Sequence, residues 1–361
     1  MAENGAGTAA SIMSPNATGR GQEGRASSRE RRAFCAAMLP KVSRTFALCI
    51  RLLPRSLSHS VTVAYLLCRI ADTIEDATDL SVADKQGLLR DFGGCLDDNG
   101  PAADSVRTAF RSRRNDEEHL AADADMILGE FHALSAPERD AIRPWVQEMC
   151  AGMAEFARAG RLVAGRELET LADLQELDRY CYFVAGTVGH LLTGLFRLSD
   201  SRADAARYEA LDRLAASFGL GLQLTNIIKD VADDHRRGWS FVPRDLCHQA
   251  GVPPEQLFDP AFRTESLQVM DALIAEARRH LADSLRYCTM LPRYQYRIRL
   301  FCLTSFYFAV RTLRRAASDR RLLEPTHKLK ITRGEVYRTV AATHVIAPSN
   351  YLVRAYYRRL A

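Results

Sequence analysis

Two uncharged stretches constrain the fold of this chain more than any other feature. Residues 180–196 (YCYFVAGTVGHLLTGLF) and 214–228 (LAASFGLGLQLTNII) contain no Asp, Glu, Lys or Arg. Each is shorter than the roughly 20 apolar residues that a helix needs to cross a bilayer, and both contain polar groups or glycines. We therefore predict that both are buried helices at the centre of a globular protein.

Most of the remaining chain also has the helical period, and almost nothing alternates at period two, so the predicted fold class is all-α. No long linker and no repeat of about 20–50 residues is visible, which predicts a single-domain bundle over residues 33–361. Residues 1–32, rich in Gly, Ala, Ser and Arg, are predicted to be a disordered tail. The predicted helices are 30–38, 43–53, 57–77, 82–95, 101–112, 118–134, 137–159, 171–196, 204–233, 264–290, 295–316 and 333–359.

Composition limits the functional classes. The net charge of +5 is small for 361 residues and the charges are interleaved, so no nucleic-acid partner is expected. The nine cysteines form no CxxC pair and no metal-ligand spacing, which indicates reduced core residues in a cytoplasmic protein. The first 32 residues lack the apolar segment of a signal peptide.

The segment LQLTNIIKDVADD (222–234) places acidic side chains on an apolar helix. Asn226, Asp230 and Asp234 lie at steps of four and share one helix face. Gln223 lies one turn earlier, as an amide ligand or hydrogen-bond partner. Repulsion and desolvation of buried carboxylates both oppose folding, so this pattern requires an explanation.

A second polar stripe occurs in VAYLLCRIADTIEDATD (63–79), where Tyr65, Arg69, Asp72 and Asp76 share a face. Either motif alone is also compatible with a solvated helix surface, and Arg69 can either pair with Asp72 or bind a diphosphate. Two carboxylate motifs facing each other across a bundle favour a hard divalent cation. Mg²⁺ uses one or two carboxylates together with substrate phosphates, so we predict a Mg²⁺–diphosphate site.

Four motifs together resemble the squalene/phytoene synthase family, and most closely its bacterial-type squalene synthases. They are SRTF (43–46), YLLCRIADTIED (65–76), YCYFVAGTVG (180–189) and LQLTNIIKDVADD (222–234), in family order and at family-like spacing. The resemblance covers roughly residues 35–360. It implies the isoprenoid synthase fold, a helical bundle that binds prenyl diphosphates.

The resemblance also implies a role for each matching residue. Tyr180 corresponds to a tyrosine beside the reacting carbons that shuttles a proton or stabilises a cation, although an ordinary packed tyrosine is the alternative. The resemblance assigns substrate binding to Ser43, Arg44, Phe46, Arg69, Gln223 and Asn226. The resemblance assigns metal binding and catalysis to Asp72, Asp76, Asp230 and Asp234. Asn226 is a further metal ligand, and Glu75 and Asp233 are supporting residues of the metal site.

The implied reaction joins two farnesyl diphosphates to presqualene diphosphate and reduces this product with NADPH to squalene. In LKITRGEVYRTVAAT (329–343), Lys330 and Arg333 are the expected contacts for NADPH phosphates, the alternative being solvated basic residues. Rival functions are a phytoene or dehydrosqualene synthase without a reductant, a prenyltransferase with another acceptor, or an inactive helical scaffold. The intact carboxylates argue against the scaffold.

The sequence departs from the family pattern in RRGWSFVP (236–243). Trp239 stands where family members often have an arginine, which leaves Arg236 or Arg237 to supply that positive charge. From the sequence, which reads to Ala361, we expect no C-terminal anchor of the kind that eukaryotic squalene synthases carry. We expect a cytoplasmic protein with peripheral membrane contact, because the hydrocarbon product leaves into lipid. Oligomeric state is not predicted.

Overall fold

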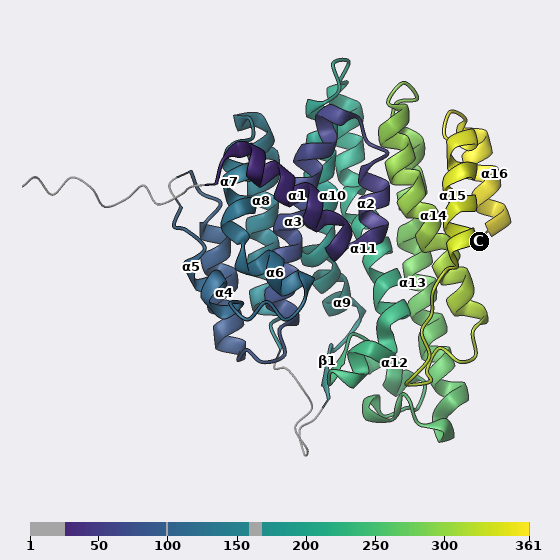
Figure 1. The fold of residues 1–361 in the computed structure, drawn as a ribbon. Coiled ribbons are helices and arrows are strands. Elements are labelled where there is room, and N and C mark those ends of the chain that lie inside the picture. The colour runs from purple at the N-terminus through teal and green to yellow at the C-terminus, as the bar shows by residue number, and fades with distance from the viewer. Residues whose placement is uncertain (1–25, 99, 159–167, 361) are drawn as a thin grey trace, which may run out of the picture.

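The computed structural model describes residues 26–98, 100–158 and 168–360, and these form a bundle of helices standing side by side (Figure 1). α4 and α5 lie at one edge of the bundle, and α15 and α16 at the other. The helices are α1 (Ser28–Val42), α2 (Arg44–Ile50), α3 (Arg55–Asp76), α4 (Val82–Gly94), α5 (Asp104–Ala109), α6 (Asp116–Ala122), α7 (Ala124–His132), α8 (Ala136–Glu155), α9 (Leu174–Cys181), α10 (Thr187–Leu198), α11 (Ala205–Arg236), α12 (Arg244–Gln249), α13 (Arg263–Met290), α14 (Tyr296–Ser318), α15 (Arg333–Ile346) and α16 (Asn350–Leu360).

Shorter elements complete the described chain. A π-helical turn, η1 (Tyr182–Gly186), joins α9 to α10, and two 3₁₀ turns, η2 (Pro254–Gln256) and η3 (Pro260–Phe262), follow α12. The strands β1 (Glu169–Thr170) and β2 (Trp239–Ser240) pair in parallel. The all-α prediction is therefore confirmed, with this two-residue ladder as a minor addition.

The centre of the bundle is α11, which packs against α10, η1, α13 and α14. Close approach depends on glycine, because a Cβ on Gly219 would collide with the carbonyl of Ala185, and one on Gly189 with the carbonyl of Ala215. These contacts bring the two uncharged stretches together, and the prediction that both form buried central helices is confirmed.

The segment Leu174–Leu198 is the only helix of the described chain that is long and apolar enough to cross a membrane. In the structure it contains α9, η1 and α10, and it packs against α8 and α11 within the bundle. Its apolar side chains thus contribute to the protein core. All nine cysteines are buried and unpaired, as predicted.

Several predicted boundaries are wrong. The predicted tail lies largely outside the described residues, but its last part, 28–32, belongs to α1, where Ser27 and Glu30 form a capping box. The predicted helix 118–134 is interrupted at Asp123, and the predicted helix 333–359 at residues 347–349, where Pro348 cannot donate a helical hydrogen bond. The short α12 was not predicted.

The glycine contacts in the core lead to a stability prediction. Gly219→Ala should lower the free energy of unfolding by about 1–3 kcal/mol, because the added methyl group meets a backbone carbonyl that cannot rotate away. Urea unfolding measures this change. The matched control is Gly87→Ala in α4, where no atom lies within 4 Å of the new Cβ and the substitution should stabilise the helix slightly. Equal effects at the two positions would contradict the role assigned to Gly219.

Candidate active site

The two acidic motifs meet where the C-terminal ends of α3 and α11 come together. Arg237 at the end of α11 joins them, because its Nη1 lies 3.5 Å from Asp76 of α3 and 4.0 Å from Asp234 of α11. Asp230, one turn before Asp234, lies 3.0 Å from the ammonium of Lys229. The predicted convergence of the two motifs is therefore seen in the structure.

The local environment disfavours the ionised forms of Asp72 and Asp234. Burial raises the pKa of Asp72 to about 6, with Asp76 adding to the rise and Arg69 opposing it. Burial likewise raises the pKa of Asp234 to about 7, where Arg237 opposes the rise and Asp230, Asp76 and Asp233 add to it. The mutual repulsion shows that the carboxylates of α3 and α11 share one electrostatic environment.

Such a cluster fits a divalent cation. Its donors are carboxylate oxygens, the ligands that Mg²⁺ prefers, and the Asp side chains retain access to water at the rim of the bundle. The guanidinium of Arg237 between Asp76 and Asp234 shows that a positive charge is already favoured there. The residues present thus suit a bound cation.

Two residues of the acidic motifs point elsewhere. Asp233 pairs with Arg236 and lies 3.8 Å from the ammonium of Lys328, so it contacts the loop after α14. Glu75 lies beside Tyr180, and burial, with Asp76 and Asp72 adding to the rise, raises the pKa of Glu75 to about 8. The side chain of Asn226 is exposed and accepts a long hydrogen bond of 3.5 Å from Lys229. Gln223 lies half-buried on the same helix.

The SRTF motif lies beside the polar face of α3. Ser43 caps α2 by accepting a hydrogen bond from the Phe46 amide at 3.2 Å, and its hydroxyl lies near the Tyr65 phenol. The Phe46 and Tyr65 rings are 5.2 Å apart. Arg44 is exposed, and no hydrogen bond or ion pair joins it to the acidic motifs within the described residues. The structure thus brings Ser43 and Phe46 to α3 but leaves Arg44 at the surface.

Arg69 connects α3 to α6. It lies 3.6 Å from Asp72 and 3.2 Å from Glu117, so the ion-pair alternative considered for Arg69 is present in the structure. Its Nε atom is buried and has no hydrogen-bond partner. A buried guanidinium nitrogen without an acceptor can still bind a phosphate oxygen.

Tyr180 is buried at the junction of α9 and η1. Its ring stacks on Phe241 at 4.7 Å and meets Phe156 edge-on at 5.5 Å. Burial raises its pKa well above the usual value, with Glu75 and Asp76 adding to the rise. The phenol is therefore protonated and lies between an aromatic wall and the acidic end of α3. The π-helical turn that follows was missed because its hydrogen-bond register leaves no mark in hydrophobic periodicity.

Trp239 lies in a group of cations and aromatic rings beside this site. The fully buried Lys85 donates hydrogen bonds to the carbonyls of Glu75 at 2.6 Å and Arg158 at 2.9 Å, and its ammonium lies 5.0 Å from the Trp239 ring centre. The guanidinium of Arg158 lies 4.6 Å from the Phe241 ring centre. Trp239 thus packs as an aromatic partner of a buried cation and leaves Arg237 to contact the carboxylates.

Sequence reasoning missed Lys85, although its pattern held a signal. Lys85 occupies the same face of α4 as Leu88, Leu89 and Phe92, all of which are buried. A lysine in register with a buried stripe needs partners for its ammonium. Here the carbonyl of Glu75, near the end of α3, is one of those partners, so Lys85 supports the helix end that carries the first carboxylates.

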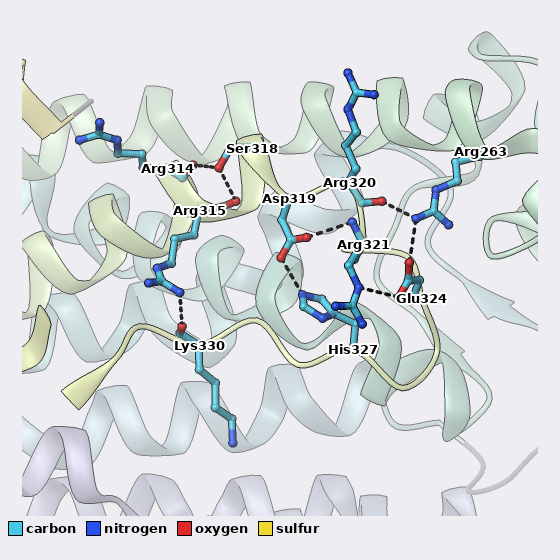
Figure 2. A network of polar contacts seen from close by, with 10 residues as sticks. All are labelled: Arg263, Arg314, Arg315, Ser318, Asp319, Arg320, Arg321, Glu324, His327 and Lys330. Atoms are coloured by element: carbon cyan, nitrogen blue, oxygen red, sulfur yellow. Dashed lines mark hydrogen bonds and ion pairs between the residues drawn. The ribbon is translucent and has the colours of Figure 1, made fainter. Parts of the chain in front are cut away.

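The loop between α14 and α15 is tied into one polar network (Figure 2). His327 bonds Asp319 at 2.6 Å, Arg321 bonds Glu324 at 2.8 Å, and Arg315 donates to the Lys330 carbonyl at 2.9 Å. The loop also contacts the end of α11, through Lys328 with Asp233 and through Arg236 with the Pro325 carbonyl. Lys330 and Arg333 are exposed, and no ion pair links them to the acidic motifs within the described chain.

Comparison with known proteins identifies the family to which this chain belongs. The sequence profile described as squalene/phytoene synthase matches residues 39–335, so the chain belongs to this family. The squalene synthase of Eremothecium gossypii is 30% identical over 82% of this chain and 64% of its own length. Squalene synthase 10 of Panax ginseng is 34% identical over 72% of this chain and 58% of its own length. The chain thus spans between half and two thirds of these relatives.

Solved structures agree with the fold. The complex of TcSQS with the ligand E5700 is similar at a TM-score of 0.75 and 26% identity, covering 92% of this chain and 91% of that one. A dehydrosqualene synthase with a bound ligand is similar at a TM-score of 0.61 and 19% identity, which supports the fold alone. The predicted isoprenoid synthase fold is confirmed.

The raised pKa of Asp234 leads to a pH-dependent prediction for the protein in EDTA. Because the folded pKa lies above the usual value of 3.8, the stability associated with this group is complete below about pH 4 and is lost as the pH rises through about 7. Asp234→Asn should therefore raise the free energy of unfolding by roughly 1–3 kcal/mol at about pH 8, and this gain should shrink towards pH 4. Urea unfolding across this range measures it.

The control for this substitution is Asp271→Asn at an exposed position of α13. It should leave the stability within about 0.5 kcal/mol of the wild type at every pH tested. A loss of stability in Asp234→Asn at high pH would show that the carboxylate is better accommodated than its burial indicates.

Proposed function

We propose that this chain is a prenyltransferase that joins two farnesyl diphosphates head to head to presqualene diphosphate and then reduces this product to squalene. The observation that carries the proposal is the convergence of the carboxylate motifs of α3 and α11 around Arg237, beside the buried Tyr180. Relatives described as squalene synthases support the same reaction. Dehydrosqualene and phytoene synthesis are the alternatives within the family.

The carboxylates provide a metal site in this proposal. Asp72 and Asp76 would hold one part of it and Asp230 and Asp234 the other, with Asn226 at its rim and with Glu75 and Asp233 in outer, supporting positions. Bound Mg²⁺ would neutralise the charge that develops on the leaving diphosphate. Arg237 already neutralises part of the carboxylate charge, so it has to yield its position or turn towards the diphosphate.

The prenyl diphosphate would be oriented by residues along α2 and α3. Arg69, with its unpartnered buried Nε, offers a donor to the diphosphate, and the Ser43 hydroxyl lies close by through Tyr65. Arg44 would reach the diphosphate from the surface, with Phe46 against the prenyl chain and Gln223 on the opposite helix. A buried binding site excludes water, which would otherwise capture the allylic cation.

Tyr180 has the properties that proton transfer near a cation requires. Its high pKa keeps the phenol protonated, and the carboxyl group of Glu75 lies beside it as a partner for the proton. The stacked ring of Phe241 adds a second π surface facing the same space. A developing positive charge beside these rings would be stabilised through their faces.

Lys330 and Arg333 would bind the phosphates of NADPH, the group that supplies a hydride. Support comes from the polar network that holds the 319–332 loop and from its contacts with Asp233 and Arg236 (Figure 2). These contacts place the loop next to the end of α11, where the second carboxylate motif ends. The proposed cellular location is the cytoplasm, with peripheral membrane contact.

Product analysis tests the proposed reaction. With farnesyl diphosphate and Mg²⁺ alone, presqualene diphosphate should accumulate, and adding NADPH should convert it to squalene, both measured by mass spectrometry.

Asp72→Asn should reduce turnover by orders of magnitude, since it removes a carboxylate ligand. Lys330→Ala should raise the KM for NADPH about tenfold and spare the first half-reaction, whereas Lys41→Ala, at an exposed position of α1, should change neither. Dehydrosqualene formed without any dependence on NADPH would refute the reductive step.

Tyr180→Phe tests the role of the phenol. If the hydroxyl moves a proton, kcat should fall by about 10²-fold or more while KM changes little. The matched control is Tyr182→Phe, which removes a hydroxyl that donates to Glu148 at 3.0 Å, away from the acidic motifs. Similar kcat values for the wild type and Tyr180→Phe would make Tyr180 a packing residue.

A further inference from the structure

The C-terminal segment of this chain carries an excess of positive charge. Residues 326–361 contain seven Lys or Arg and one acidic residue, Glu335, for a net charge of +6. Within this segment, α15 and α16 together hold five arginines and one glutamate.

The outer side of α15 and α16 is also unusually apolar. Of the six large hydrophobic residues that are exposed in the described chain, four lie on these two helices, with exposures of 70%, 72%, 73% and 41% for Tyr337, Val345, Tyr351 and Leu352. Tyr337, Ala341 and Val345 follow at steps of four and form one exposed stripe. The opposite side of α15 is buried through Thr339, Thr343 and Ile346.

Exposed arginines accompany these apolar side chains. Tyr351, Arg354 and Arg358 are spaced three and four apart and share the outer side of α16, with Arg359 next to them. Arg338 is exposed beside Tyr337 on α15. None of these arginines forms an ion pair with an acidic side chain in the part of the chain that the structure describes. We call Tyr337, Arg338, Val345, Tyr351, Leu352, Arg354, Arg358 and Arg359 the α15–α16 face.

The face rests on a firmly packed support. Tyr307 of α14 donates a hydrogen bond to the Val353 carbonyl at 2.8 Å, and the buried Arg299 bonds the Ala347 carbonyl at 2.8 Å and the Asn350 side chain at 2.7 Å. These contacts fix the turn between α15 and α16. The two helices form the edge of the bundle, and no other described element covers their outer side (Figure 1).

We propose that the α15–α16 face docks the protein on an anionic phospholipid bilayer. Tyrosine rings are favoured at the level of the lipid headgroups, and arginines can bind lipid phosphates while their stems lie along the apolar boundary. A second copy of the chain is a poorer occupant, because two such faces would bring like charges together. The choice of a bilayer rests in part on the proposed function, since a C30 hydrocarbon leaves most readily into lipid.

Co-sedimentation of the full chain with vesicles tests the proposal. The protein should bind phosphatidylcholine vesicles containing phosphatidylglycerol much more tightly than pure phosphatidylcholine vesicles, and added salt should weaken binding. Arg354→Gln and Arg358→Gln should each lower the partition coefficient about fivefold, which corresponds to about 1 kcal/mol per charge. Tyr337→Ser and Tyr351→Ser should each lower it by a similar factor in vesicles of either composition.

Matched controls lie at other positions in the bundle. Arg90→Gln on α4 removes an exposed arginine and Leu198→Ser on α10 removes an exposed apolar side chain, and neither should alter vesicle binding. Circular dichroism should show the same helix content for every variant.

Three outcomes would overturn the proposal. The protein would fail to bind anionic vesicles, or it would bind them equally well after the face substitutions, or Tyr351→Ser would abolish a dimer seen by light scattering. Vesicle binding does not require turnover, so a protein that binds vesicles but makes no squalene would refute the proposed reaction and leave the docking surface intact.

Discussion

The structure depends on holding like charges together. Asp72, Asp76, Asp230 and Asp234 repel one another, and burial raises the pKa of Asp72 and Asp234, so the site itself opposes folding. The opposing free energy comes from the apolar packing of α11 against α10 and α13, where glycines allow the backbones to approach closely. Arg237 supplies part of the missing positive charge. The packing of the uncharged helices thus offsets the free-energy cost of the charged site.

The sequence predicted most of this arrangement from two periodic signals. Uncharged stretches at helical period predicted the central helices, and carboxylates at steps of three and four predicted that Asp72 and Asp76 would share a face, as would Asp230 and Asp234. The sequence predicted that the two motifs face each other and that Arg236 or Arg237 supplies a positive charge, but it did not predict that Arg237 contacts both Asp76 and Asp234. Periodicity describes one helix at a time, so it cannot specify which side chain of one helix contacts another.

The features that were missed depend on tertiary contacts or on backbone register. Lys85 was not singled out from the sequence, and its importance follows from its ammonium, which contacts the carbonyl of Glu75 and the ring of Trp239. The pairing of β1 with β2 joins segments about 70 residues apart through two residues each, too few for alternation to be visible. The break before α16 had a local signal in Pro348, which the continuous apolar pattern of the segment obscured. Trp239 was identified as a departure, but its role became clear only from the cation beside it.

The π-helical turn Tyr182–Gly186 makes the site sensitive to the number of residues between Tyr180 and α10. A π turn contains one residue more than an α turn, and each residue of an α-helix rotates the chain by about 100°. The turn therefore fixes the angle between the face of α9 that carries Tyr180 and the face of α10 that packs on α11. Removing a single residue here would restore a regular helix and keep every named side chain, yet it would turn Tyr180 away from Glu75. Among homologous chains, the spacing between this tyrosine and the glycines of α10 should consequently tolerate substitutions far better than insertions or deletions.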